Sequence, residues 1–249
     1  MRKILYILIA LFLGSDLLVA QSANTALEQG QELNVLYRNE AVGGIIVHSR
    51  GFGLTYKRLK HVTGKRKRFI EFDLLNMRHP KEYKVHFGGK GAAKSFYYGK
   101  LNSVFVLRSG VGFQNVLYQR AERKSVEIRC SYSVGASIAF AKPVYLYVFH
   151  DNEKDPFIEQ YDPSKHTLDN IAGRAPFING FDRMSVHPGA YAKLGFSFEF
   201  ADYSNEVKAI EIGDIVDAYP NAVAIMAYNP KEQAFVTLYA TFVMGKKWF

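Results

Sequence analysis

The sequence contains a single cysteine, Cys130, among its 249 residues. One cysteine cannot pair within the chain, so a disulfide scaffold is excluded. Charged residues make up only 22% of the chain and aromatic residues 14%, which excludes an intrinsically disordered protein. Lys, Arg, Asp and Glu nevertheless recur through almost every later segment, which excludes a membrane protein with several helical spans.

The sequence also lacks the common signatures of catalysis and cofactor binding. No GxGxxG, Walker loop, CxxC or HExxH pattern occurs. A lipid-modifying enzyme would need Ser, His and a carboxylate together, but the adjacent pair His48-Ser49 points to opposite faces of any strand. We therefore expect no enzymatic activity, no catalytic residue and no cofactor.

One long segment does gather ligands that Ca²⁺ accepts. Two of its histidines and five of its carboxylates are the candidate ligands, and they lack the spacing of an EF-hand. Acidic residues in loops are usually only solvated, so we expect no specific metal site. The residues are His150, Asp151, Glu153, Asp155, Asp162, His166 and Asp169.

The N-terminal segment has the pattern of a targeting signal. Arg2 and Lys3 precede an apolar run of ten residues at 4–13, and Val19-Ala20 provides a small-residue cleavage site. A retained anchor helix is the alternative, but ten residues are too few to cross ~30 Å of hydrocarbon. We expect a signal peptide at 1–20 and a short tail at 21–30, followed by one domain at 31–249.

The chain is basic, with 32 Lys and Arg against 23 Asp and Glu. An exported protein seldom meets nucleic acid, and the positive charges alternate with apolar residues along strands, so we expect no nucleic-acid partner. The one dense basic cluster is 57–68 (KRLKHVTGKRKR). We interpret it as a solvated turn; the alternative is a contact with anionic lipid head groups, lipopolysaccharide or an acidic partner.

Alternation with a period of two residues dominates the sequence after residue 30 and predicts strands. In 126–140, every second residue from Val126 to Phe140, Cys130 included, lies on an apolar face, while the other face is charged or small. The same division recurs in 70–74, 105–114, 193–200 and 236–245, and more weakly in 209–217, where Asp214 falls on the apolar face.

These strands predict an all-β fold, an eight-stranded antiparallel transmembrane β-barrel of the up-and-down type. A soluble sandwich would also alternate, but the strands are long and their polar faces are rich in Gly, Ser and charge, as a narrow lumen requires. A C-terminal strand ending in Trp248 and Phe249 resembles the sorting signal of bacterial outer-membrane barrels. The strands are expected at 31–39, 43–58, 67–77, 102–118, 125–149, 189–202, 206–219 and 233–247.

An even strand count places both ends of the barrel domain on the periplasmic side. The long segments near 78–101 and 150–187 then become extracellular loops, and 118–125 and 202–206 become short periplasmic turns. Segment 222–228 could be a further strand, so the count is uncertain by one hairpin. The expected location is the outer membrane of a Gram-negative cell, with outer-membrane lipid and lipopolysaccharide as partners.

A barrel of eight strands has an interior filled by side chains, so a porin is a poor interpretation. We expect opposite charges to pair across this lumen as a structural plug, because unpaired buried charges are costly. The predicted lumen cluster consists of Glu71, Asp73, Arg108, Glu127, Arg129, Lys193, Glu199, Glu211 and Asp217.

The segment 150–187 is too long and too rich in aromatic residues and proline for a slack loop, and an ordered module is expected. It either covers the barrel mouth or binds a partner, which we expect to be another outer-membrane protein. Rigid aromatic rings lose little entropy on contact, so they are the candidate anchors. These are Phe157, Tyr161, Phe177 and Phe181; the last two flank Gly180 in the stretch PFINGF at 176–181.

Eight short motifs are distributed over most of 31–249. They are YRNEA (37–41), RHPKE (78–82), YGKLN (98–102), KPVYL (142–146), YDPSKH (161–166), GRAPF (173–177), KLGFSFEF (193–200) and VDAYP (216–220). Together they resemble a widespread family of Bacteroidota outer-membrane β-barrel proteins.

The resemblance implies no catalytic residue. Because small barrels of this kind accompany larger outer-membrane machines, among them the barrel assembly machinery, it implies an accessory subunit with a role in outer-membrane protein assembly or export. A lipid-binding or lipid-modifying barrel is the second interpretation, and a channel for small solutes is the third.

Overall fold

The computed structural model describes residues 37–85, 94–119, 125–150, 155–200 and 205–249. The predicted signal peptide at 1–20 and the tail at 21–30 lie outside the described residues. The chain divides into two units, Met1–Val35 and Leu36–Phe249, and the second holds everything described below. In the part that the structure describes, no helix is long and apolar enough to cross a membrane.

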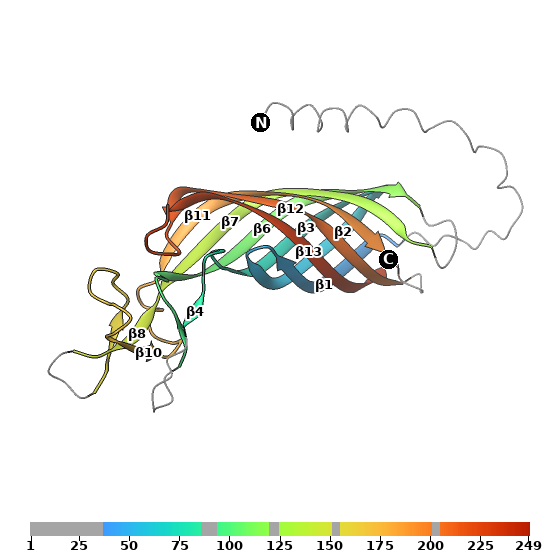
Figure 1. The fold of residues 1–249 in the computed structure, drawn as a ribbon. Coiled ribbons are helices and arrows are strands. Elements are labelled where there is room, and N and C mark those ends of the chain that lie inside the picture. Colours follow the sequence, from blue (N-terminus) through green and yellow to red (C-terminus); the bar gives the residue numbers. More distant parts are fainter. Residues whose placement is uncertain (1–36, 86–93, 120–124, 151–154, 201–204) are drawn as a thin grey trace, which may run out of the picture. The chain divides into compact units, whose positions relative to one another are not determined.

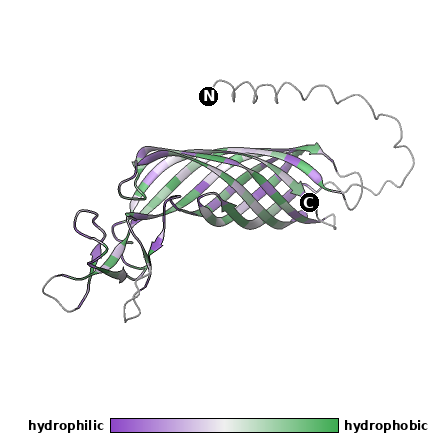
Figure 2. Cartoon of the chain, viewed as in Figure 1, coloured by the Kyte–Doolittle hydropathy of each residue, from purple (hydrophilic) through white to green (hydrophobic). Residues whose placement is uncertain are grey.

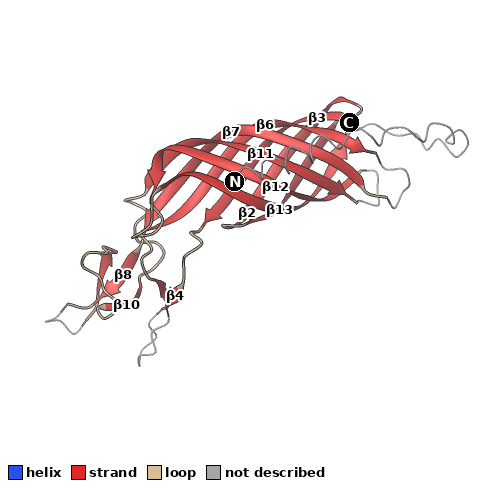
Figure 3. Ribbon diagram, turned by 45° about the horizontal axis from the view of Figure 1, so that its top comes forward, coloured by secondary structure: helices blue, strands red, loops and turns tan. Residues whose placement is uncertain are grey.

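Eight long antiparallel strands close into a barrel (Figure 1), which confirms the predicted fold class. Their order around the barrel is β1-β13-β12-β11-β7-β6-β3-β2, so each strand lies beside its neighbour in the chain, and β1 closes the ring by pairing with both β2 and β13. Figure 3 shows the strands as one continuous wall. The strands are β1 (Asn39–His48), β2 (Gly51–Thr63), β3 (Arg66–Met77), β6 (Asn102–Tyr118), β7 (Glu127–Pro143), β11 (Ser185–Glu199), β12 (Glu206–Val223) and β13 (Glu232–Trp248).

The predicted alternation holds along the barrel wall. In β7, Tyr132 and Val134 are exposed on the outside, whereas Ser131, Ser133 and Ser137 are buried in the lumen. Buried and exposed residues alternate along β2, β3, β11 and β13 as well, and Figure 2 shows hydrophobic and hydrophilic residues mixed along the barrel strands. Cys130 also lies on the outer face, half-buried, as its place in the pattern predicts. Aliphatic and aromatic side chains therefore cover the outside of the barrel, and polar side chains occupy its inside.

The two N-terminal strands differ from the prediction. A single strand at 43–58 was expected after one at 31–39, but Ser49 and Arg50 form a tight turn between β1 and β2. The outward residues are odd-numbered before this turn, as in Ile45 and Val47, and even-numbered after it, as in Phe52. This change of phase was the sequence signal for a turn at 49–50. It was missed because the turn lacks an Asn-Gly type pair. Residues 31–36 of the expected first strand lie outside the described residues.

The expected strand 125–149 is also two elements. The barrel strand β7 ends at Pro143, and β8 (Tyr145–Val148) belongs to a separate three-stranded sheet with β9 (Phe157–Gln160) and β10 (Ile171–Arg174). Proline cannot donate a ladder hydrogen bond, which explains the break. β4 (Lys84–Val85) pairs with β5 (Phe96–Tyr97) in a further small sheet.

The two ends of the barrel differ in their connections. The loop end carries the turn at 49–50 and the connections 78–101, 144–184 and 224–231; the turn end carries 64–65, 119–126, 200–205, the start of β1 and the end of β13. Segment 222–228 forms no additional strand: β12 ends at Val223, and the following residues make only an isolated bridge between Met226 and Lys100.

Candidate functional site

An ion pair spans the lumen in the half of the barrel nearer the loop end. Arg108 of β6 donates from Nε to Asp217 of β12 at 2.8 Å, and its Nη2 binds the second carboxylate oxygen. Ser137 donates to the same carboxylate at 3.0 Å and lies 2.7 Å from the hydroxyl of Tyr219. Arg108 and Asp217 are both fully buried.

A second group of charges fills the middle of the lumen. Lys193 lies 3.3 Å from both Glu71 and Asp73, and Lys57 contacts Glu211 at 2.8 Å. These pairs join strands that are far apart around the ring, namely β11 with β3 and β2 with β12. Two tyrosines add donors: Tyr191 binds Glu71 at 2.8 Å, and Tyr239 binds Glu211 at 2.7 Å.

A third group lies toward the turn end and centres on Arg129. Its guanidinium pairs with Glu127 at 2.5 Å, with Glu199 and with Glu40 at 4.0 Å. Glu40 also pairs with Lys67. Buried charges are tolerated when each has a partner and further hydrogen bonds. Every charge in the three groups has an ion-pair partner, although Nη1 of Arg108 has no hydrogen-bond partner within the described residues.

The structure places all nine predicted lumen residues inside the barrel and in ion pairs, with Glu127 the most exposed of them. It adds Glu40, Lys57, Lys67, Tyr191 and Tyr239, which the sequence analysis missed. Lys57 and Lys67 belong to the basic cluster interpreted as a solvated turn, and that interpretation is wrong for these two lysines, which are buried. Only Gly64 and Lys65 lie between the strands.

The described parts of the connections at the loop end pack together as the loop module, which is made of β4, β5, β8, β9, β10 and the described residues beside them. Backbone hydrogen bonds tie the connections together: Arg174 donates to Lys94 at 3.1 Å and Ala227 donates to Gly99 at 2.7 Å. The module has its own apolar core. Long loops that share a core present a defined surface. The core residues are Phe96, Leu146, Val148, Tyr161 and Ile171.

Tyr161, one of the four predicted anchors, belongs to this core. It is 4% exposed and meets Tyr98 edge-on with ring centroids 6.3 Å apart, so it holds the module together and offers no surface to a partner. Burial raises the pKa of its phenol to about 12. Phe157 has the opposite placement: it lies on β9, an edge strand of the small sheet, and is 44% exposed.

Phe177 and Phe181 form a contact pair with ring centroids 5.4 Å apart. Both rings also receive the ammonium of Lys142, at 4.7 and 5.3 Å, and Phe177 meets Phe105 of the barrel wall at 6.2 Å. Gly180 allows the turn between them, because its φ of 93° is one that other residues rarely adopt. The pair therefore packs the loop against its own barrel while remaining half exposed.

The histidines of the candidate calcium segment have other partners. Asp162 donates its backbone N–H to Nδ1 of His166, so Nε2 carries the proton that is shared with Glu159 at 3.2 Å. His150 approaches the same carboxylate at 3.5 Å. Within the described residues, no group of three His, Cys, Asp or Glu could hold a metal ion. Asp151 and Glu153 lie outside the described residues.

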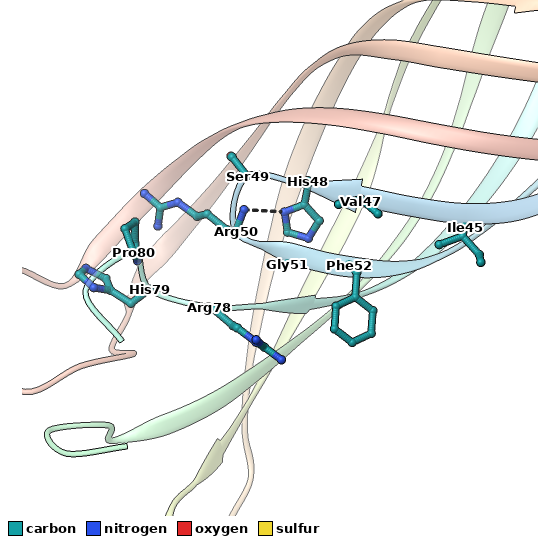
Figure 4. A pocket seen from close by; sticks show the side chains of 10 residues that line it. All are labelled: Ile45, Val47, His48, Ser49, Arg50, Gly51, Phe52, Arg78, His79 and Pro80. Carbon is teal, nitrogen blue, oxygen red and sulfur yellow. Dashed lines mark hydrogen bonds between the residues drawn. The ribbon is translucent and has the colours of Figure 1, made fainter. Parts of the chain in front are cut away.

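An open pocket of about 510 Å³ surrounds the β1–β2 turn (Figure 4). Its apolar wall is Ile45, Val47 and Phe52, all more than half exposed on the outside of the barrel. The guanidinium of Arg78 lies 5.8 Å from the ring of Phe52, at the rim. The pocket therefore has an apolar wall on one side and a positive charge at its rim. His48 is buried and accepts a backbone hydrogen bond from Arg50, whereas Ser49 is exposed, so the two do not face one site.

Arg50 completes the inner side of this turn. Its guanidinium pairs with Glu232 at the start of β13 and lies 5.1 Å from the ring of Phe235. The turn is thereby held to the strand beside it. Arg78 differs, because no ion pair to it is present within the described residues. It is the cation of the pocket that remains available to a ligand.

Comparisons with known proteins give only weak likenesses. No family model matches the chain, and no curated protein matches it. Ail, the attachment invasion locus protein of Yersinia pestis, solved with the heparin analogue sucrose octasulfate, has 7% identity and a TM-score of 0.42, covering 85% of this chain and 99% of Ail. Neisserial surface protein A has 7% identity and a TM-score of 0.38, covering 85% of this chain and 97% of that protein. Scores this low transfer no property to this chain.

Proposed function

We propose that this chain is a non-enzymatic outer-membrane barrel that acts as a structural or accessory subunit of a membrane protein complex. The outer surface supports the membrane location. Apolar outward residues of β7 run from Ile128 to Phe140, which at ~3.3 Å per residue and a tilt of ~40° is about 30 Å along the membrane normal. A barrel in an outer membrane needs an apolar band of ~25 Å. The resemblance of the sequence motifs to Bacteroidota outer-membrane barrels supports the accessory role.

The lumen does not support transport. Its charges are buried and paired, and an apolar cluster that includes Ile46, Val106 and Phe235 fills the space toward the loop end. A conducting pore needs a wider barrel with a hydrated lumen. We therefore infer that the protein acts through its exposed surface. The loop module is the largest part of that surface outside the cell in the proposed orientation.

One observation carries this proposal: β9 is an exposed edge strand with apolar side chains. It pairs with β8 on one side, and Phe157 and Ile158 are each 44% exposed. Within the described residues no strand covers its other edge. Exposed strand edges bind extended segments of other proteins, with backbone hydrogen bonds giving affinity and side chains giving specificity. The edge of β9 is therefore the proposed partner-binding surface.

A photo-crosslinking amino acid at Ile158 tests this proposal in native outer membranes. The matched control carries the same amino acid at Asp169, an exposed residue of the same module. We expect a discrete heavier adduct from position 158 and none from 169, with both variants folded by heat-modifiable gel migration. Folded protein that yields no adduct at position 158 contradicts the proposed surface, and equal adducts at both positions show that contact there is not specific.

The pocket at the β1–β2 turn favours a second candidate function, the binding of lipopolysaccharide. Acyl chains would lie on Ile45, Val47 and Phe52, and a lipid phosphate would meet Arg78. Arg78→Gln should then reduce lipopolysaccharide copurification, while Lys231→Gln, which removes an exposed cation at the same end, should not. If both variants copurify with as much lipopolysaccharide as the wild type, this pocket is not its binding site.

A further inference from the structure

Five cations gather on the outside of the barrel at its turn end. Arg58 and Lys60 follow the outward residues of β2, Arg66 and Arg68 lie on β3, and Lys246 lies near the end of β13. All five are exposed. They point away from the lumen, because the residues beside them in the chain, Lys57, Leu59 and Lys67, are buried inside, and Lys247 binds Glu199 of the lumen. We call these five the outer basic surface.

The register brings like charges together on this surface. Lys60 lies directly opposite Arg68 in the β2–β3 ladder, and both face outward. Arg58 and Lys246 both pair with Ala41 of β1, so only a methyl group stands between them along the ladder. Like charges placed directly opposite one another destabilise a sheet unless an anion lies between them. A bound anion would therefore reduce the repulsion between these cations.

Within the described residues, the ladders place no acidic residue opposite Arg58, Lys60 or Arg68. Glu206 of β12 lies opposite Lys246 but pairs with Lys208. Within the described residues, Arg58, Lys60, Arg68 and Lys246 make no ion pair, although the nearby outward Lys208 pairs with Glu206 at 3.1 Å. Arg66 is held by aromatic contacts instead: its guanidinium lies 4.1 Å from the ring of Phe113, and it donates to the hydroxyl of Tyr132 at 3.2 Å. Aromatic residues beside cations are typical of the level where lipid head groups meet the acyl chains.

The apolar belt is also short on these two strands. Its outward apolar residues run from Phe52 to Tyr56 on β2 and from Ile70 to Leu74 on β3, each ~13 Å along the strand. On β7 the run from Ile128 to Phe140 is ~40 Å long. Lipid head groups therefore meet the barrel closer to its middle on the β2–β3 side, at the level of the cations.

We propose that the outer basic surface binds the phosphate head groups of anionic glycerophospholipids. The turn end faces the periplasm in the proposed orientation, because it holds the short turns and both ends of the barrel domain. Its leaflet is the phospholipid leaflet, not the one that carries lipopolysaccharide. Each phosphate lies between two cations, at Lys60 and Arg68 or at Arg58 and Lys246, and removes their repulsion. The proposal rests on the membrane location but not on a partner protein.

Native mass spectrometry of the detergent-solubilised barrel tests the proposal with two defined lipids, phosphatidylglycerol and phosphatidylcholine. The test variant is Arg58→Gln/Lys60→Gln/Arg68→Gln. The matched control, Lys84→Gln/Lys165→Gln/Lys231→Gln, removes the same charge from exposed residues at the loop end. Arg58→Lys/Lys60→Arg keeps the charge, and heat-modifiable migration reports the folding of each variant. No partner protein is present, so failure here is separable from failure of the accessory role.

The wild type should retain phosphatidylglycerol at least about tenfold better than phosphatidylcholine, as a basic surface of several cations implies. The test variant should lose most of that preference, and the control and the charge-keeping variant should preserve it. Equal retention of the two lipids by the wild type overturns the proposal. So does a control variant that loses as much preference as the test variant, or a test variant that is folded and unchanged.

Discussion

Arg108 and Asp217 form a two-point ion pair across the lumen, between strands that are not neighbours in the barrel. The guanidinium Nε lies 2.8 Å from the carboxylate Oδ1, and both side chains are fully buried. The pair joins β6 to β12, and β11 and β7 lie between these strands in the ring. It fixes the shape of the barrel from within.

Removing one member of this pair should weaken the barrel strongly. Arg108→Ala leaves a buried carboxylate without its cation, which costs ~3–5 kcal/mol. The double variant Arg108→Leu/Asp217→Leu should recover part of this loss, because no charge is then left unpaired. Urea unfolding in detergent micelles measures the free energy of unfolding of both variants. A single variant as stable as the wild type would show that the pair does not hold the barrel.

Gly110 makes room for a lumen tyrosine. A Cβ at this position would lie 2.3 Å from the hydroxyl oxygen of Tyr191, which binds Glu71. Gly110→Ala should therefore displace the ring and destabilise the barrel by about 1–3 kcal/mol. Gly64→Ala is the control, because a Cβ there meets nothing within 4 Å. The same unfolding assay should separate them, and equal stability of the two variants would refute the packing argument.

Asp214 is an exposed carboxylate among the apolar outward residues in the middle of the barrel wall. In the ladder it lies between Leu194 of β11 and Leu238 of β13, near the middle of the strand. A charge facing lipid at mid-depth is costly, so Asp214→Leu should stabilise the barrel in lipid vesicles by about 1 kcal/mol. Asp217→Leu, three residues away but in the lumen, should do the reverse. If Asp214→Leu destabilises the barrel, that face does not meet lipid.

The sequence predicted the barrel because hydrophobic burial acts on every second residue, and a long strand repeats that signal many times. Five of the eight strands lie close to their expected bounds, and β6 matches at both ends. The N-terminal hairpin was missed because a two-residue turn interrupts the alternation without a glycine or asparagine between the strands. The same error hid two lumen residues, because Glu40 fell in the expected gap between the strands 31–39 and 43–58, and the phase of Ile45 and Val47 places Lys57 outside the lumen.

Contacts between loops that are distant in the sequence could not be predicted from a periodic pattern. Tyr161 looks like an exposed anchor in the sequence, because its burial depends on Phe96 and Tyr98 from a connection more than sixty residues earlier. The pairing of lumen charges likewise requires the order of strands around the ring. Local sequence determined which residues face inward, and the closed topology determined which of them meet.

The loop module should lose stability in strong alkali through Tyr161. Its folded pKa of about 12 lies above the ordinary value of about 10, so the unfolded module releases this proton more readily. Stability is then unchanged below pH 10 and falls between pH 10 and 12. The difference in tyrosinate absorbance between the wild type and Tyr161→Phe measures this ionisation directly. A midpoint near 10 would mean that the phenol is not buried.

Cysteine labelling in intact outer membranes tests the membrane barrel most directly. Cys130 is first replaced by Ala, and single cysteines are then placed at Phe140, Phe198 and Phe242 on the outer face and at Leu168, which is 40% exposed in the loop module. A water-soluble maleimide should label position 168 readily and the three outer-face positions poorly, because lipid covers them. Ready labelling of all three outer-face positions in folded protein would contradict the account.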